Sequence, residues 1–184
     1  MMNLKIMELQ HYTVSKELML LEPRLLKGQR CTVVHERHRK YVVHASVKRV
    51  VSRVCALYGT SIQSSTLLSK EITKGTKKLP IGLGTMHPLI LIPTASPSNS
   101  HTQWVVFDAI QNYAPAIFNE CSIQLANGET HTLNLSYHSL RTQISHAHAI
   151  DKYFRTLNFD ERTNIYAPLF YGEVALHTLL PMDQ

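Results

Sequence analysis

The sequence predicts a single α+β domain built from antiparallel β-hairpins and two principal packed helices. Three observations predict this class: β-branched or alternating runs flank turn residues, two longer segments repeat apolar residues at helical spacing, and strands do not alternate regularly with helices. The 184 residues, 44% of them hydrophobic, suffice for one core without disulfides. We expect residues 1–158 to form the domain and residues 159–184 to form a tail that is packed or binds a partner.

The chain is expected to begin with strands. Residues 4–22 are apolar without a clean period, which favours strand-like structure. Residues 30–34 (RCTVV) and 40–44 (KYVVH) are β-branched runs, and together they predict a hairpin. Its tip would be strongly basic, because it carries His35, Arg37, His38, Arg39 and Lys40.

Residues 46–59 predict the first helix. Its apolar residues, at positions 47, 50, 51, 54, 57 and 58, recur at helical spacing, and Ser46 and Gly59 suit the two ends. Since valines are poor helix formers, the helix should depend on packing its apolar stripe against a sheet. The opposite side would then present Lys48, Arg49 and Arg53.

The segment after this helix is polar and carries four lysines. We expect loop or irregular strand here, with Gly75 and Pro80 as breaks. The lysines are Lys70, Lys74, Lys77 and Lys78. Two apolar runs then predict strands: PLILIPT (88–94), bounded by prolines, and WVVF (104–107).

A further hairpin, at residues 121–136, and the second helix complete the predicted domain. Residues 121–136 alternate apolar and polar side chains around Asn127 and Gly128, which we expect to form a two-residue turn with positive φ at both positions. The second helix should run from about Ser139 to Leu157, with an apolar stripe at positions 140, 144, 147, 150, 154 and 157.

The charges are unevenly distributed along the chain. The formal net charge is +6, yet residues 24–78 hold 13 of the 19 Lys and Arg and only Glu36 and Glu71 among the acids. No Lys or Arg occurs between residues 79 and 140. This segregation indicates a directed basic surface rather than general solubility.

Neither an enzyme nor a metal protein is expected. The chain has no GxSxG elbow, no HExxH, no phosphate-cradling glycine loop and no paired carboxylates. His146 and His148 would lie two apart on a helix and face different directions, and His35 and His38 in the hairpin tip are no better placed for a metal. We therefore expect no catalytic residue, cofactor or metal.

The location is expected to be cytoplasmic. Three cysteines with no metal or redox spacing suit a reducing compartment, and the N-terminus lacks the features of a signal peptide. No apolar run approaches the length of a membrane span.

The basic residues predict a nucleic-acid surface. Hairpin tip, helix face and lysine-rich loop provide separately placed cations, and neutralised phosphates dominate nucleic-acid affinity. Arginines can also enter the narrow minor groove of A-tracts. The bland alternative is that these charges are ordinary solvated surface. The predicted DNA-binding residues are Arg37, Arg39, Lys40, Lys48, Arg49, Arg53, Lys70, Lys74, Lys77 and Lys78.

An ordered series of motifs over residues 28–155 resembles the ComK family, the competence transcription factors of Gram-positive bacteria. The series consists of the basic hairpin leading to RVVSRVCALYGTS, then LPIGLGTMHPLILIPT, the QWV strand, and the ANG hairpin running into LNLSYHSLRTQ. The order and spacing of these pieces carry the resemblance.

The resemblance implies a transcription activator of DNA-uptake genes. It implies binding to AT-rich boxes of double-stranded DNA largely through the minor groove, assembly as a homodimer or homotetramer on paired boxes, and control by proteolysis through the MecA adaptor and ClpC.

Departures from the family pattern leave a second hypothesis open. Ser64 and Ser65 stand where relatives carry a Gly-Arg or Gly-Lys pair, and Ser145 and His146 stand near a position that is commonly basic or aromatic. The alternative is a regulatory protein-interaction module that keeps the fold but has lost competent DNA binding.

Overall fold

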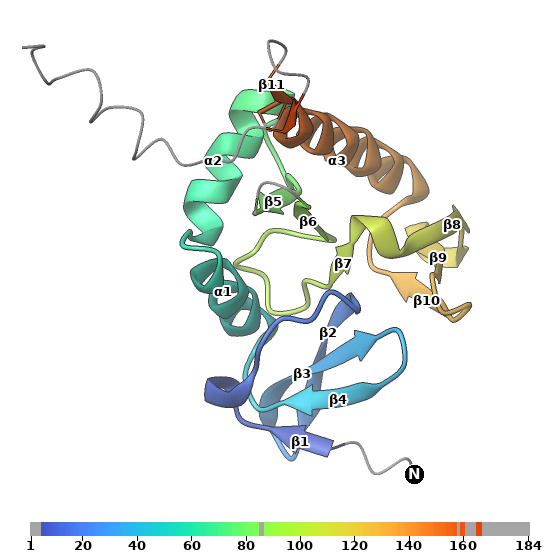
Figure 1. The fold of residues 1–184 in the computed structure, drawn as a ribbon. Coiled ribbons are helices and arrows are strands. Elements are labelled where there is room, and N and C mark those ends of the chain that lie inside the picture. Colours follow the sequence, from blue (N-terminus) through green and yellow to red (C-terminus); the bar gives the residue numbers. More distant parts are fainter. Residues whose placement is uncertain (1–4, 85–86, 158, 161–164, 167–184) are drawn as a thin grey trace, which may run out of the picture.

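A seven-stranded sheet organises the chain in this computed structural model, which describes residues 5–84, 87–157, 159–160 and 165–166 (Figure 1). The strand order is β1-β4-β3-β2-β7-β6-β5, and neighbours are antiparallel except for the parallel pair β1 and β4. The bounds are β1 Lys5–Met7, β2 Leu18–Leu26, β3 Gln29–Glu36, β4 Lys40–Val43, β5 Ile81–Leu83, β6 Leu89–Pro93 and β7 Trp104–Val106.

A three-stranded antiparallel sheet of order β10-β9-β8 lies beside the larger sheet. Its strands are β8 Ile110–Pro115, β9 Cys121–Leu125 and β10 Thr130–Leu133. The short strands β11 Phe159–Asp160 and β12 Ile165–Tyr166 pair with each other. The helices are α1 Val47–Leu57, α2 Ile62–Thr73 and α3 Tyr137–Leu157, and 3-10 turns span Leu9–His11, Phe107–Ala109 and Ile117–Asn119.

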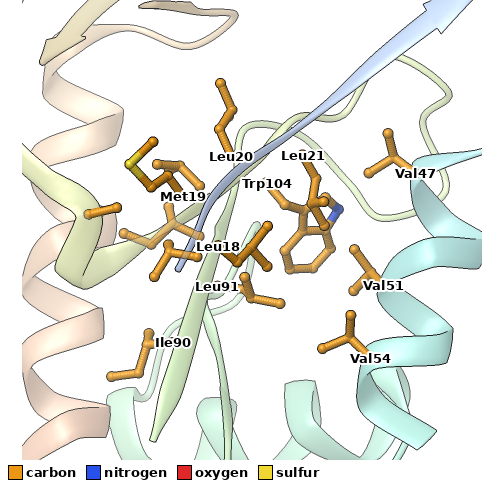
Figure 2. Close-up of a cluster of buried hydrophobic side chains, with 14 of the residues drawn as sticks. Leu18, Met19, Leu20, Leu21, Val47, Val51, Val54, Ile90, Leu91 and Trp104 are labelled. Carbon is orange, nitrogen blue, oxygen red and sulfur yellow. The ribbon is translucent and has the colours of Figure 1, made fainter. Parts of the chain in front are cut away.

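The main core fills both faces of the central strands (Figure 2). Leu21 and Trp104 lie beside the valines of α1, whereas Met19 and Ile90 lie on the side of α3. All four side chains are at most 3% exposed. The sheet is therefore covered on both faces, which explains why the buried start of β2, residues 18–21, and β6 read as continuous apolar runs rather than as alternating ones.

The predicted α+β class is confirmed, and most predicted elements are present. The hairpin of β3 and β4 forms as expected, and α1, β6, β7 and α3 lie within about two residues of their predicted bounds. Within residues 4–22, strand structure is found in β1 and in the start of β2, with a 3-10 turn between them. Most of the predicted tail, residues 159–184, lies outside the described residues.

The prediction of loop or irregular strand around Lys70 was wrong, because residues 62–73 form α2. Ser61 caps this helix by accepting a hydrogen bond from the Ser64 amide at 3.0 Å, and Lys74 ends it in the left-handed conformation with φ of 56°. The buried Ser69 hydroxyl donates to the carbonyl of Ser65 at 2.9 Å. Small polar side chains thus interrupt the inner face, on which Ile62, Leu68 and Ile72 also pack, so no continuous apolar stripe marks the helix in the sequence.

The predicted two-residue turn at Asn127 and Gly128, between β9 and β10, was also wrong in detail. Of Asn127 and Gly128, only Gly128 has positive φ, at 85°. The Gly128 amide donates to the carbonyl of Leu125, and the Leu125 amide donates to that of Glu129, both at 2.8 Å. This is the three-residue loop with a left-handed glycine, the next most common hairpin connection after the two-residue turns.

Strands β5 and β8 were not predicted, and some predicted stripe positions are exposed. Leu57 and Tyr58 at the end of α1 and Leu157 at the end of α3 are 41–45% exposed. Apolar spacing continued to the helix ends, but the sheet beneath did not extend that far. Helix ends commonly outrun the surface on which they pack.

Candidate nucleic-acid interface

The structure separates the predicted basic groups. Strand β4 runs from the hairpin tip at Lys40 to Val43, and α1 begins at Val47 beyond its other end. The tip therefore points away from α1 and toward the three-stranded sheet (Figure 1). Hairpin tip and α1 do not form one continuous surface.

Every Arg and Lys of the hairpin tip contacts a carboxylate. Arg37 pairs with Glu17 at 3.2 Å, Arg39 pairs with Glu36, and Lys40 Nζ lies 2.8 Å from Oε1 of Glu129. The hydrogen bond from Lys40 is the main cause that lowers the pKa of Glu129 to about 2. The tip is consequently close to neutral despite its basic sequence.

The pair of Arg39 and Glu36 has a structural explanation. Glu36 is only 3% exposed and also accepts a hydrogen bond from the Tyr41 hydroxyl at 2.9 Å. Burial and then the neighbouring Glu36 raise the pKa of Tyr41, and the hydrogen bond to Glu36 raises that of Arg39. A buried carboxylate needs such partners, so Arg39 compensates the charge of Glu36 and adds little to the positive potential of the surface.

The cations of α1 are differently placed. Lys48 and Arg49 are exposed, Arg53 is partly buried, and none of the three forms an ion pair within the described residues. They lie opposite the buried Val47, Val50, Val51 and Val54. No acidic residue occupies the first turn, so the amide groups of the helix N-terminus add to the positive potential.

Two arginines that the sequence analysis did not select extend this surface. Arg24 and Arg30, near the turn between β2 and β3, line a cavity of about 510 Å³ together with Ser46 at the start of α1. Arg30 also lines a smaller neighbouring cavity with Lys48. Both arginines are exposed. Pairing β2 with β3 brings them to the N-terminus of α1, and no local sequence pattern indicates this.

A second hollow lies further along α1. It has a volume of about 300 Å³ and is lined by Glu8, Leu9, Gln10, His44, Arg49 and Arg53. The buried Nε of Arg53 has no hydrogen-bond partner there. Glu8 pairs with His44 at 3.2 Å and leaves both arginines without an ion pair among the described residues. This face of α1 therefore keeps uncompensated positive charge.

The four lysines associated with α2 are exposed. Lys70 lies in its last turn, Lys74 ends it, and Lys77 and Lys78 follow. Helix α2 continues from α1 along the same side of the molecule (Figure 1). At about 1.5 Å per residue, α1 and α2 are about 16 and 18 Å long, so their cations are spread along that side.

The fold brings together a group of potential metal ligands that the spacing of histidines along the sequence did not predict. His148 packs on Phe107 with its ring centroid 4.7 Å away. Among the described residues, His35, Glu129 and His131 form a group whose potential metal-ligand atoms all lie within 4.8 Å of one another.

No described helix is long and apolar enough to cross a membrane.

The comparisons with known proteins agree on one family. A family model described as ComK protein matches residues 9–157. The chain is similar to a curated protein of Bacillus subtilis (strain 168) named competence transcription factor, with 24% identity over 136 residues, covering 74% of this chain and 71% of that protein. No solved structure matches. Because the family model matches most of the chain, the protein belongs to the ComK family.

Proposed function

We propose that this protein is a transcription activator of competence genes that binds AT-rich double-stranded DNA through the minor groove, without catalysis. Membership in the ComK family and the name of the Bacillus subtilis relative support the regulatory part of the proposal. The observation that carries the DNA-binding part is the row of α1 cations without carboxylate partners among the described residues.

We assign the principal contacts to Lys48 and Arg49, supported by Arg24, Arg30 and Arg53. The two side chains on α1 are exposed, and the cavities beside them contain the two added arginines. The α2 lysines are secondary contacts further along the same side. The hairpin-tip residues Arg37, Arg39 and Lys40 contribute less, because each is already paired with a carboxylate.

The minor-groove and AT-rich parts follow from the family resemblance and from physical complementarity. A-tracts narrow the minor groove and concentrate negative potential, which favours inserted arginines. The AT-rich boxes are paired in the family pattern, so a homodimer or homotetramer on DNA is part of the proposal. Control through MecA and ClpC is also proposed from the resemblance.

The test is equilibrium binding of the full chain to a duplex with two AT-rich boxes and to a GC-rich duplex of equal length across a salt series. We expect tighter binding to the AT-rich duplex. A plot of log affinity against log salt concentration should fall with a slope of about 0.9 per phosphate contacted. The double variant Lys48→Ala/Arg49→Ala should lower that slope by about 1.8 if each residue neutralises one phosphate. Unchanged affinity in a folded double variant would overturn the assignment to α1.

Arg37→Ala is the matched control, because it also removes an exposed arginine, but one that is paired with Glu17. Its slope should change by clearly less than 0.9. Arg53 is left out of the test because it is partly buried, so its removal would mix binding with stability.

The second candidate is a protein-interaction module of the same fold without competent DNA binding. One observation favours a protein contact: Ile117 and Phe118, between β8 and β9, are 72% and 89% exposed. Equal, weak binding to both duplexes, together with tight association with a protein partner that added salt does not weaken, would select this function over the activator.

A further inference from the structure

Two sheets meet at a cluster of histidines and carboxylates outside the basic surface. His35 comes from β3 of the large sheet, whereas Glu129 and His131 come from the loop and strand that follow β9. The two imidazole rings meet edge to face, with centroids 4.7 Å apart and an interplanar angle of 86°. A nitrogen of each ring and a carboxylate oxygen of Glu129 lie within 4.8 Å of one another.

The hydrogen bonds of His35 leave one of its nitrogens available. Its Nε2 lies 3.2 Å from Oε2 of Glu22. An ionised carboxylate can only accept, so Nε2 carries the hydrogen, and Nδ1 is the lone-pair nitrogen of the neutral ring. Nδ1 is buried and has no hydrogen-bond partner. A carboxylate that orients an imidazole through its other nitrogen is the usual outer partner of a metal-binding histidine.

The contact between the other two residues is weaker. Lys40 occupies Oε1 of Glu129, whereas Oε2 lies 3.4 Å from Nε2 of His131, a long hydrogen bond that metal binding would replace.

We propose that His35, His131 and Glu129 bind a transition-metal ion such as Zn²⁺ between the two sheets, with water completing the coordination. Two imidazoles and a carboxylate are ligands that zinc accepts at about 2.0–2.2 Å. Ligand atoms around a tetrahedral zinc lie about 3.3 Å apart, so the side chains need to close by at most about 1.5 Å. The proposal does not depend on DNA binding.

The bound ion would act as a clamp between the sheets. A second connection already crosses the same boundary: the Gln103 side chain donates to the carbonyl of Thr132 and accepts from the amide of Asn134, at 3.2 and 3.0 Å. The metal would add a further connection, between His35 of β3 and His131 of β10. Because an ion that binds only the folded chain stabilises it by mass action, the thermal midpoint should rise with zinc concentration.

No metal was expected from the sequence because spacing rules compare histidines that are neighbours in the chain. His35 was paired with His38, and His146 with His148. The tertiary structure instead joins His35 to His131, which lies in a different hairpin. No spacing rule for adjacent ligands applies to such a pair.

The experiment uses the tag-free full chain, dialysed against a chelator and titrated with Zn²⁺ in competition with a chromophoric chelator. The expected result is one tight site per chain, with a rise in thermal midpoint. His131→Asn and Glu129→Gln should each weaken binding at least tenfold. Cobalt substituted for zinc should give the intense visible bands of a tetrahedral site, and His131→Asn should abolish them.

His44→Asn is the matched control, because His44 also pairs with a glutamate but belongs to no group of three potential metal ligands among the described residues. It should bind zinc as the parent chain does. His35 is left intact in the test because its burial makes any replacement a risk to folding. Circular dichroism checks that each variant folds, and Glu129→Gln carries the test if His131→Asn does not.

Three outcomes would overturn the proposal. The first is absence of stoichiometric zinc binding by the folded parent chain. The second is zinc binding that survives both His131→Asn and Glu129→Gln unchanged, which would place the ion elsewhere. The third is equal loss in His44→Asn, which would indicate nonspecific binding to surface histidines.

Discussion

Gly82 in β5 is expected to be intolerant of any side chain, because α3 packs directly over it. A Cβ added at this position would lie 2.5 Å from Cε2 of Phe154 and 2.7 Å from Cγ2 of Ile150. Carbon atoms in contact normally lie about 3.5–4.0 Å apart, so each overlap is about 1 Å. Gly82→Ala therefore forces α3 or its side chains to move.

The size of the effect follows from two opposing contributions. Overpacking of a core costs about 1–3 kcal/mol. Replacing glycine by alanine in a strand returns about 0.5–1 kcal/mol of backbone entropy. The net loss in free energy of unfolding should be about 1–2 kcal/mol, which corresponds to a fall in thermal midpoint of about 2–8 °C for a chain of this size.

Urea unfolding of Gly82→Ala, Phe154→Leu and the double variant measures the contact directly. The double variant should be more stable than the sum of the single effects by at least about 0.5 kcal/mol, because the smaller leucine leaves room for the new methyl group. Gly28→Ala is the control: nothing lies within 4 Å of its added Cβ, but its φ is +77°. It should cost about 1 kcal/mol through backbone strain and show no coupling to Phe154→Leu.

The reasoning would be refuted if Gly82→Ala left the free energy of unfolding unchanged or raised it. Strict additivity of Gly82→Ala with Phe154→Leu would also refute it, since the cost would then not arise at the contact with α3.

Two further predictions concern ionisable groups. Cys31, Cys55 and Cys121 are all buried, and desolvation raises the pKa of each thiol, that of Cys55 to about 11; the native chain should therefore show no fast reaction with a thiol reagent, whereas all three thiols react after denaturation. One rapidly reacting thiol in the native chain would contradict this. Partial desolvation, and then Asp151, raise the pKa of Asp108 above its unfolded value. The ionised carboxylate therefore destabilises the fold, and this loss of stability grows as pH rises from the unfolded pKa through the higher folded pKa. Asp108→Asn should stabilise the chain at about pH 7, and urea unfolding should show the gain shrinking toward about pH 4, where a constant gain would argue against the carboxylate as its source.

Local sequence patterns were sufficient for most elements because their determinants lie within a few residues. The valines of α1 repeat at helical spacing, and β-branched runs flank the basic tip of the first hairpin. Helix α2 was missed for the converse reason: Ser65 and Ser69 are the buried residues of its inner face, where the Ser65 hydroxyl bonds to that of Thr60 and the Ser69 hydroxyl bonds to the carbonyl of Ser65. These serines interrupt the apolar period of Ile62, Leu68 and Ile72, which pack against the core.

The basic surface shows a similar division. The sequence correctly located the segment richest in Lys and Arg, and on α1 it selected the side opposite the valines, where Lys48 and Arg49 are exposed. It did not reveal that Arg39 neutralises the buried Glu36, or that Lys40 pairs with Glu129 of another hairpin. Charge in a sequence does not state which opposite charges the fold brings within contact distance.

Periodicity, turn residues and the order of motifs are properties of the linear chain, so they were enough to predict the α+β class, most strands and helices, and the ComK family. They do not predict which side chains meet, because that depends on the folded arrangement. The pairing of β2 with β3 places Arg30 beside α1, and the contact of two sheets joins His35 to His131. These contacts depend on strand order and sheet packing. Both are determined jointly by residues that are far apart in the sequence, so no local pattern predicts them.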